Sequence, residues 1–385
     1  MKGKQIAILL VLLVIIGGVA FFLQKRNQSE WTESATRSEA KILDFPINDV
    51  TRVVIQAPNG QVQLAKKNDV WVVEEKADYP ANFERVSGLI RQLWELHPVQ
   101  ELKVGPSQFS RFELTEPGQG DNAGTVIELK DKGDKTLARI VAGKRDMQKG
   151  EGPRQFPMPA GRYVLAPQTG KVSLVSQMLE TDVKPESWLK RDFVKIDNPS
   201  SIVVAGQTGP KHWTLTRTDA KAEWKLTDAK PNEELDKAST GSLATVLASP
   251  SFADVLPPDA KPDEHGLDKP ETLTIQTFNG FSYTLKIGKA EGSNYPVRVS
   301  VTGNLARERT PAPDEKPEDK TKKDEEFKTQ SKKLEEKAAS EKELEKRIYL
   351  IPKSTLDPFL KDRAELMAKK TPPSPSPAAA PRKKR

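Results

Sequence analysis

The sequence predicts an α+β protein in which an N-terminal transmembrane helix is followed by two tandem copies of one mostly antiparallel sheet-plus-helix domain. Three observations predict this class. The chain opens with a long run of uncharged residues. The rest of the chain repeats itself at an interval of about 150 residues. Each repeat contains alternating apolar residues and hairpin turns around one amphipathic stripe, without the strand-helix-strand order of a parallel sheet.

The uncharged run extends from Ile6 to Leu23 and is long enough to cross a membrane. Eighteen residues in helical conformation cover about 27 Å, close to the hydrocarbon thickness of a bilayer. A cleaved signal peptide is the alternative, but large residues stand at positions 21 to 23, where cleavage requires small ones. We therefore expect an uncleaved anchor at residues 6–23, preceded by a short cytoplasmic head at residues 1–5.

The charges beside this segment do not decide which side of the membrane the body occupies. Lys2 and Lys4 precede the segment, and Lys25 and Arg26 follow it. A short head before one long polar body is the usual order when the body is exported. We therefore expect a single-pass membrane protein with a cytoplasmic N-terminus and a periplasmic body, joined by a linker at residues 24–41. A cytoplasmic body is the alternative.

Two short motifs reveal the internal repeat. Residues 112–117 read FELTEP, and residues 265–270, 153 positions later, read HGLDKP. Each motif precedes an alternating apolar stretch that closes on Gly-Lys. We expect a first repeat domain at residues 42–198 and a second at residues 199–368.

The same shift of 153 residues superimposes Trp71 on Trp224 and Gly88 on Gly241. We expect the two tryptophans to be buried at equivalent positions. Both glycines fall within a stripe of apolar residues at three- and four-residue spacing, which predicts one main amphipathic helix in each copy. Glycine is unfavourable in a helix, so its recurrence suggests close backbone packing or a helix break. The stripes consist of Phe83, Val86, Leu89, Ile90, Leu93 and Trp94, and of Leu235, Ala238, Leu243, Val246 and Leu247.

The repeated motifs predict a structural role. Each supplies one leucine suited to burial and one proline that stops a helical run. They stand where the chain enters a hairpin, which Asn279 and Gly280 turn in the second copy.

The second copy contains a charged insertion at residues 302–346. It is too charged to build a core, and its Glu, Lys and Ala content predicts a solvated helix after Thr321. Its apolar stripe is broken, which leaves a coiled coil as the minor alternative. The last segment, residues 369–385, is rich in proline and ends in RKKR, so we expect a disordered basic tail.

Charge and composition exclude several classes of function. The formal net charge is +7, but residues 51–300 contain 33 Lys and Arg against 33 Asp and Glu, so the excess lies at the ends. A neutral body argues against nucleic-acid binding. The chain has no cysteine, and it lacks the HExxH, GxSxG and phosphate-loop motifs. We expect no catalytic residue, no cofactor and no metal, although a hydrolase that uses two carboxylates stays open as a third hypothesis.

Several segments resemble the bacterial family known as domain of unknown function 4340. These are DVTRVVI, VWVVEEK, LTEP, GLDKP, the strand that ends in IGK, and YLIP. The resemblance extends over both copies. It implies a membrane-anchored envelope protein, in some members associated with components of gliding-type ABC transporters. The family has no assigned catalytic residues, so the resemblance transfers none.

The functional hypothesis is a non-enzymatic, membrane-anchored envelope protein that acts as a scaffold or as an accessory component of a gliding-type ABC transporter. The copies differ most at residues 145–162 and 290–347, and loops that diverge often carry binding surfaces. We expect Phe156, Met158 and Phe327 to bind the partner. The alternative is an extracytoplasmic module that binds a carbohydrate or peptide. A concave site would favour this alternative over a scaffold.

Overall fold

A computed structural model describes residues 40–120, 122–148, 158–207, 211–231, 233–311 and 315–368. The described chain divides into two compact units after Lys190. The predicted head, anchor and basic tail, most of the predicted linker and also Phe156 lie outside the described residues. Among the described residues, no helix combines the length and the apolar character that crossing a membrane requires.

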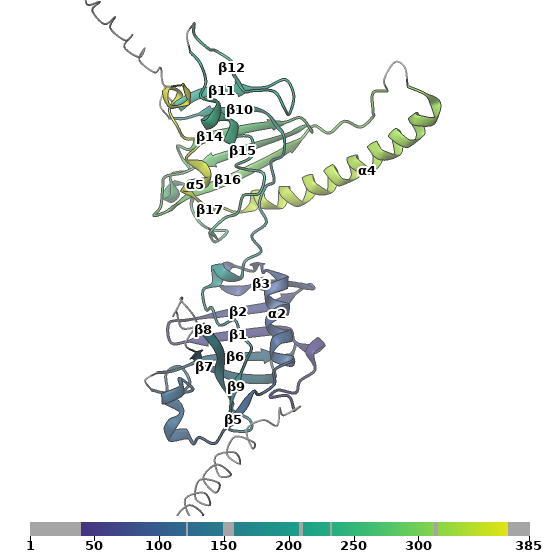
Figure 1. Cartoon of the computed structure of the whole chain (residues 1–385). Coiled ribbons are helices and arrows are strands. Elements are labelled where there is room, and N and C mark those ends of the chain that lie inside the picture. Colours follow the sequence, from purple (N-terminus) through teal and green to yellow (C-terminus); the bar gives the residue numbers. More distant parts are fainter. Residues whose placement is uncertain are drawn as a thin grey trace, which may run out of the picture. The chain divides into compact units, whose positions relative to one another are not determined.

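Unit 1 is built on an antiparallel sheet, in which the described residues form nine strands in the order β4-β3-β2-β1-β6-β7-β8-β9-β5. Helix α2 (Phe83–Trp94) lies across one face of this sheet (Figure 1). It buries Val86, Leu89, Ile90 and Leu93, as its apolar spacing predicts. The strands are β1 (Arg52–Ala57), β2 (Gly60–Lys67), β3 (Val70–Val73), β4 (Tyr79–Pro80), β5 (Gln100–Leu102), β6 (Thr125–Lys130), β7 (Thr136–Gln148), β8 (Met158–Ala166) and β9 (Lys171–Val175). Short 3-10 helices span Ile47–Asp49, Glu74–Lys76, Pro106–Phe112 and Pro185–Trp188.

Unit 2 is built on a second antiparallel sheet, whose eight described strands follow the order β12-β11-β10-β14-β15-β16-β17-β13. The strands are β10 (Pro199–Ala205), β11 (His212–Thr216), β12 (Lys225–Leu226), β13 (Asp254–Val255), β14 (Glu271–Thr277), β15 (Phe281–Ile287), β16 (Asn294–Gly303) and β17 (Tyr349–Pro352). The helices are α3 (Lys237–Ser242), α4 (Pro317–Lys342) and α5 (Lys353–Leu356), with 3-10 helices at Pro262–His265, Glu343–Lys346 and Arg363–Leu366.

The predicted fold class was wrong. The described chain is a mixed α/β structure of two antiparallel sheets with few helices, rather than a repeated sheet-plus-helix domain behind a transmembrane helix. The main helix expected in the second copy is reduced to α3, which has six residues. Its sequence explains the difference. The hydroxyls of Thr240, Ser242 and Thr245 donate to backbone carbonyls three or four residues earlier, and such bonds compete with a regular helix.

The two sheets nevertheless share one strand order when the two-residue strand β4 is left out. The equivalence extends to single residues. Leu64 pairs with Val73 in unit 1, and Leu215 pairs with Leu226 in unit 2. Trp71 lies two residues before Val73, and Trp224 lies two residues before Leu226. Both tryptophans are buried, so their predicted equivalence and burial are confirmed.

The two recurring helix glycines do not mark close packing. A Cβ atom placed on Gly88 or on Gly241 would have no other residue within 4 Å. Gly88 lies inside the uninterrupted helix α2, and Gly241 lies next to the last residue of α3. The expectation of close backbone packing at these glycines was therefore wrong.

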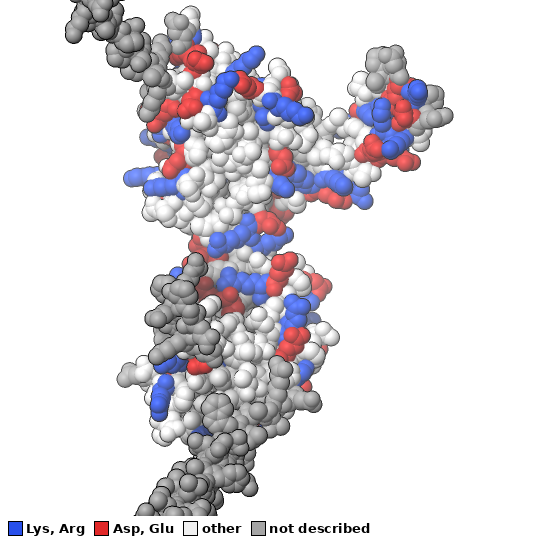
Figure 2. Space-filling model, viewed as in Figure 1, with Lys and Arg blue, Asp and Glu red and all other residues white. Residues whose placement is uncertain are grey.

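Helix α4 extends away from the sheet of unit 2 (Figure 1). Its 26 residues span about 39 Å, and it begins at Pro317, earlier than the sequence predicts. Figure 2 shows Lys, Arg, Asp and Glu side chains mixed over its described surface. Among its described side chains, only Glu341 is buried. The helix is therefore an arm with one attached end.

Glu341 attaches the arm to the sheet. Its side chain is only 6% exposed. Its Oε1 atom accepts from the Lys195 backbone N–H at 2.8 Å, and its Oε2 atom accepts from the Tyr283 hydroxyl at 2.8 Å. The Lys337 ammonium lies 3.9 Å from Oε1. The expectation that the whole insertion is solvated was therefore wrong at this end.

The attachment should depend on pH. Burial raises the pKa of Glu341 above its ordinary value of 4.5, aided by Asp197, while Lys195 N–H, Lys337 and Tyr283 favour the charged form. A raised folded-state pKa means that the contribution to stability is complete below the unfolded pKa and is lost as pH rises through the folded pKa.

The free energy of unfolding of wild type should therefore fall, relative to that of Glu341→Gln, as pH rises from the unfolded-state pKa of Glu341 through its folded-state pKa. The reason is that the glutamine variant has no proton to lose. Chemical denaturation at several pH values measures the difference. Glu336→Gln, at an exposed position of α4, serves as the control and should follow wild type. Parallel pH profiles for wild type and Glu341→Gln would contradict the assignment.

Candidate functional site

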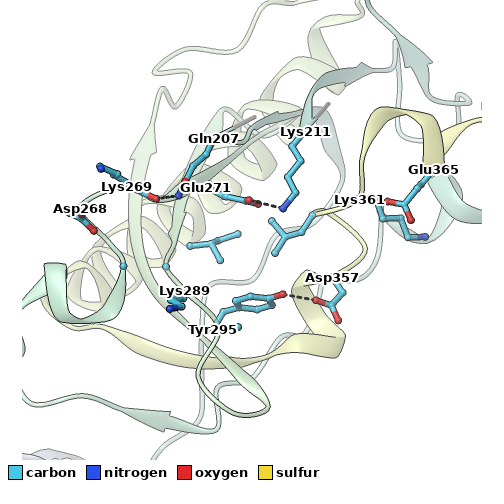
Figure 3. Close-up of a pocket in the computed structure, with 15 residues that line it drawn as sticks. Gln207, Lys211, Asp268, Lys269, Glu271, Lys289, Tyr295, Asp357, Lys361 and Glu365 are labelled. Carbon is cyan, nitrogen blue, oxygen red and sulfur yellow. Dashed lines mark hydrogen bonds and ion pairs between the residues drawn. The ribbon is translucent and has the colours of Figure 1, made fainter. Parts of the chain in front are cut away.

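A polar pocket of about 730 Å³ lies in unit 2, at one end of its sheet (Figure 3). This volume is within the range of small-molecule sites. Ten polar or charged residues line it, together with the apolar Ile287 and Leu360. The polar residues are Gln207, Lys211, Asp268, Lys269, Glu271, Lys289, Tyr295, Asp357, Lys361 and Glu365.

The motifs found in the sequence form one wall of this pocket. Residues of the HGLDKP motif and of the Gly-Lys pair that follows β15 line it together. The Lys289 N–H donates to the His265 carbonyl at 3.1 Å. A Cβ atom on Gly288 would stand 2.1 Å from the same carbonyl oxygen, closer than any side chain can approach. Only glycine therefore fits at this contact.

Unit 1 repeats this contact with its own motif. A Cβ atom on Gly143 would stand 2.3 Å from the carbonyl oxygen of Phe112, in the FELTEP motif. Leu114 of this motif is buried, while its counterpart Leu267 is half-buried. The motifs recur because the chain must pass close to the glycine of Gly-Lys in both units. The predicted burial of the motif leucine is therefore confirmed for Leu114 but not for Leu267.

Two pairs of lining residues interact within the pocket of unit 2, one as an ion pair and one through a hydrogen bond. The Lys211 ammonium lies 2.7 Å from Glu271 Oε1, and the Tyr295 hydroxyl donates to Asp357 Oδ1 at 2.9 Å (Figure 3). Burial, together with Asp357, raises the pKa of Tyr295 to about 12. Tyr295 is therefore neutral at physiological pH and keeps its proton as a hydrogen-bond donor. Glu271 Oε2 is buried and has no hydrogen-bond partner among the described residues.

Three lysines of the pocket form no close ion pair, although the hydrogen bond from Ser239 and, to a smaller extent, the charge of Lys361 lower the pKa of Asp236. The ammonium groups of Lys269, Lys289 and Lys361 form no ion pair within the described part of unit 2, whereas Lys211 is neutralised by Glu271. Glu365 accepts from the Asp362 N–H at 2.9 Å. The lining nevertheless holds four lysines and four carboxylates, so its formal charge is zero.

The equivalent position in unit 1 is filled by an arginine. Ala142 pairs with Val164, and Arg162 lies two residues before Val164. In unit 2, Ile287 precedes Gly288 as Ala142 precedes Gly143, and Ile287 pairs with Val297. Tyr295 lies two residues before Val297, so Tyr295 and Arg162 occupy equivalent positions in the two units.

Arg162 closes this position in unit 1. Its guanidinium is buried and donates to the carbonyl of Gly143 at 2.8 Å, to that of Leu179 at 3.3 Å and to Thr181 Oγ1 at 3.0 Å. Burial lowers the pKa of Arg162 to about 10, and nearby Arg145 acts in the same direction. The protein itself therefore satisfies the cation at this position of unit 1.

The residues that the sequence nominated for partner binding do not lie at this pocket. Phe156 is outside the described residues. Met158 begins β8 of unit 1 and is 68% exposed. Phe327 lies on α4 of unit 2, where it is half-buried beside Arg309 and Asp324. Met158 and Phe327 therefore belong to different units.

Sequence reasoning missed the pocket itself. Its polar residues come from strands and turns far apart along the chain, and no spacing rule connects them. One signal was present, since the GLDKP and Gly-Lys motifs contribute Asp268, Lys269 and Lys289. The repeated motifs identify residues that the two units have in common. The pocket depends on Tyr295, and at that position unit 1 has Arg162 instead.

Comparison with known proteins gives one result. No similar curated protein and no similar solved structure was found. The sequence profile of the family described as "Domain of unknown function (DUF4340)" matches residues 71–270, which is more than half of the chain. The match begins in β3 of unit 1 and ends just before β14 of unit 2. The protein belongs to the DUF4340 family.

Proposed function

We propose that this protein is a non-enzymatic scaffold or accessory component of a bacterial membrane complex, with a gliding-type ABC transporter as the partner. Arm α4 is the observation that carries the proposal. It is long and highly charged, and its described part contributes only Glu341 to the buried interior. A helix of this kind adds little to the core of its own unit, so contact with another molecule accounts for it better than folding does.

The composition of the arm suits such a contact. Phe327 offers an aromatic group, and the Arg309 guanidinium beside it lies 2.7 Å from Glu315 and 2.8 Å from Asp324. Aromatic and arginine side chains supply much of the binding energy in protein interfaces, and the surrounding charges orient the partner.

The proposed place of action is the periplasmic side of a membrane. The support is the order of the sequence, in which one long polar body follows a short head and an uncharged run. The body would then present both units to a membrane partner.

A second candidate function is a periplasmic module that binds a small ligand. The pocket of unit 2 favours it, because the pocket is concave and polar, whereas the equivalent position of unit 1 holds the buried guanidinium of Arg162. The two functions are compatible, since an accessory protein can bind both a ligand and a partner.

Shortening the arm tests the first function. Thr310 to Lys333 would be replaced by a Gly-Ser linker of about ten residues, which can span the gap and leaves Lys337 and Glu341 in place. Thermal unfolding should change little, because the one buried side chain in the described portion of the removed part, Glu315, pairs with Arg309 and Lys323 of the insertion itself and not with the sheet. Recovery of the transporter subunit with the tagged chain, from native membranes in detergent, should be lost.

Two point variants sharpen this experiment. Phe327→Ala should reduce recovery of the transporter subunit, and Ala339→Ser, at an exposed position of the attached end, should not. The membrane preparation also tests the place of action, because the chain must be recovered in it. Undiminished recovery with the shortened arm would reject the arm as the contact.

A further inference from the structure

Strand β12 of unit 2 lacks the neighbour that its counterpart β3 has in unit 1. In unit 1, β4 pairs with β3, so that Tyr79 lies opposite Val73. The Ala81 N–H continues this pairing and donates to the Trp71 carbonyl at 2.7 Å. In unit 2, β12 pairs with β11 and is the last strand of the described sheet.

Unit 2 contains a segment that corresponds to β4, but this segment does not pair with β12. Asn82 and Asp236 cap α2 and α3. The N–H of each donates to a carbonyl near the end of its own unit, that of Trp188 at 2.7 Å and that of Leu366 at 2.9 Å. The three residues before each cap therefore correspond to each other, and in unit 2 these are residues 233–235. Within the described part of unit 2, no backbone hydrogen bond joins them to β12.

An arginine holds this segment of unit 2 in place. The Arg363 guanidinium donates to Asp228 Oδ1 at 2.7 Å, to the Asp228 carbonyl at 2.8 Å and to Glu233 Oε2 at 2.7 Å. Glu233 corresponds to Tyr79, which is buried in unit 1. Unit 1 thus places an aromatic residue opposite β3, whereas unit 2 has a carboxylate there that pairs with Arg363.

A groove of about 640 Å³ is lined by residues of β12, of the segment 233–235 and of α3. We call it the edge groove. Its apolar lining includes Trp224, Leu226, Leu235 and Met367. Side chains that lie directly opposite each other on paired strands share one face of a sheet, so a residue opposite Leu226 would stand beside this apolar lining.

The backbone of β12 is also suited to a further strand. The Thr227 N–H donates to the Thr214 carbonyl of β11 at 3.0 Å. Alternate residues of a strand direct their backbone groups to opposite edges, so Trp224 and Leu226 direct their N–H and C=O groups away from β11. A strand edge of this kind accepts an extended peptide, whose main chain supplies hydrogen bonds and whose side chains enter the adjoining groove.

We propose that the edge groove binds an extended peptide of a partner protein, which adds a strand beside β12. The peptide places an aromatic residue opposite Leu226, as unit 1 places Tyr79 opposite Val73, and donates a backbone N–H to the Trp224 carbonyl. Unit 1 supports this occupant, because it holds an aromatic strand at the equivalent place. No described residue of α4 lines the groove, so this surface is additional to the proposed contact of the arm.

A synthetic peptide with the sequence of residues 77–83, ADYPANF, is the probe. Calorimetric titration into the full-length chain should give a Kd between about 10 µM and 1 mM. Serine in place of the tyrosine should weaken binding about tenfold or more, because the apolar contacts of the ring are lost. Methylation of the second alanine's amide nitrogen should weaken binding by a similar factor, because it removes the N–H for the Trp224 carbonyl.

A variant of the chain locates the binding. Ala244→Phe should weaken the peptide about tenfold or more, because Ala244 lines the edge groove and the larger side chain would fill it. Thr245→Phe is the matched control, since Thr245 is the next residue, is exposed and does not line the groove. Its affinity should stay within about twofold of wild type. The methylated peptide tests the wild-type chain, so the proposal stays falsifiable if Ala244→Phe does not fold.

Three results would overturn the proposal: absence of binding by ADYPANF, equal binding of the methylated peptide, or unchanged affinity in Ala244→Phe. Binding that appears only when the chain is ended at Ala368 would also overturn it, because the groove would then belong to residues 369–385 of the chain itself. Recovery of the transporter subunit is a separate measurement, so failure here leaves the scaffold proposal intact, and failure there leaves the peptide site intact.

Discussion

Replacing Trp188 with alanine should lower the free energy of unfolding of unit 1 by about 3 to 5 kcal/mol, the range for removal of a large aromatic side chain from a core. Trp188 is fully buried. Its indole N–H donates to the Asp182 carbonyl at 2.9 Å, and the Arg85 guanidinium lies 4.8 Å from the centre of its ring. Its own carbonyl accepts from the Asn82 N–H at 2.7 Å.

These contacts link the end of unit 1 to the start of α2, because Asn82 caps that helix. Chemical denaturation monitored by far-ultraviolet circular dichroism measures the loss. Phe83→Ala is the control, since Phe83 is 64% exposed at the first position of α2 and its removal should change stability by less than about 0.5 kcal/mol. A loss below 1 kcal/mol for Trp188→Ala would mean that this junction adds little to stability.

Replacing Gly288 with alanine should destabilise unit 2 by about 3 kcal/mol, the upper part of the range for overpacking. The added Cβ would meet the backbone oxygen of His265 at 2.1 Å, and Leu267 Cγ at 3.3 Å. A backbone atom cannot turn away as a flexible side chain can, so the motif that forms the pocket wall must move. Chemical denaturation measures the loss.

Gly241→Ala is the matched control in the same unit. A Cβ atom at Gly241 would meet no other residue within 4 Å, and the residue lies in a helix. The exchange should therefore stabilise the unit by up to about 1 kcal/mol. Equal effects from the two exchanges would show that the approach of His265 to Gly288 is not tight.

The sequence predicted the parts of the fold that depend on local patterns. Alternating residues located most strands, and the stripe from Val86 to Leu93 located α2, because burial of one face imposes a regular spacing. The repeat predicted the shared core, since Trp71 and Trp224 fill the same place beside the paired strands.

Other features could not be predicted because they depend on competition or on distant contacts. The stripe near Leu243 predicted a helix, but the hydroxyls of neighbouring Ser and Thr residues offered the backbone other partners. Glu341 looked solvated among many charged residues, and only the fold brings Tyr283 and the Lys195 N–H to it. No local pattern singles out Tyr295, because it matters only by comparison with unit 1, which has Arg162 at the equivalent position.

The first and last residues of the family match have a practical consequence for expressing parts of this protein. A fragment cut at residues 71 and 270 would lose β1 and β2, which lie between β3 and β6, and all strands from β14 to β17. Both remaining sheets would present unpaired strand edges, which favour aggregation. A cut between Lys190 and Arg191 leaves every described strand with its neighbours. Sequence similarity and independent folding thus call for different fragment ends.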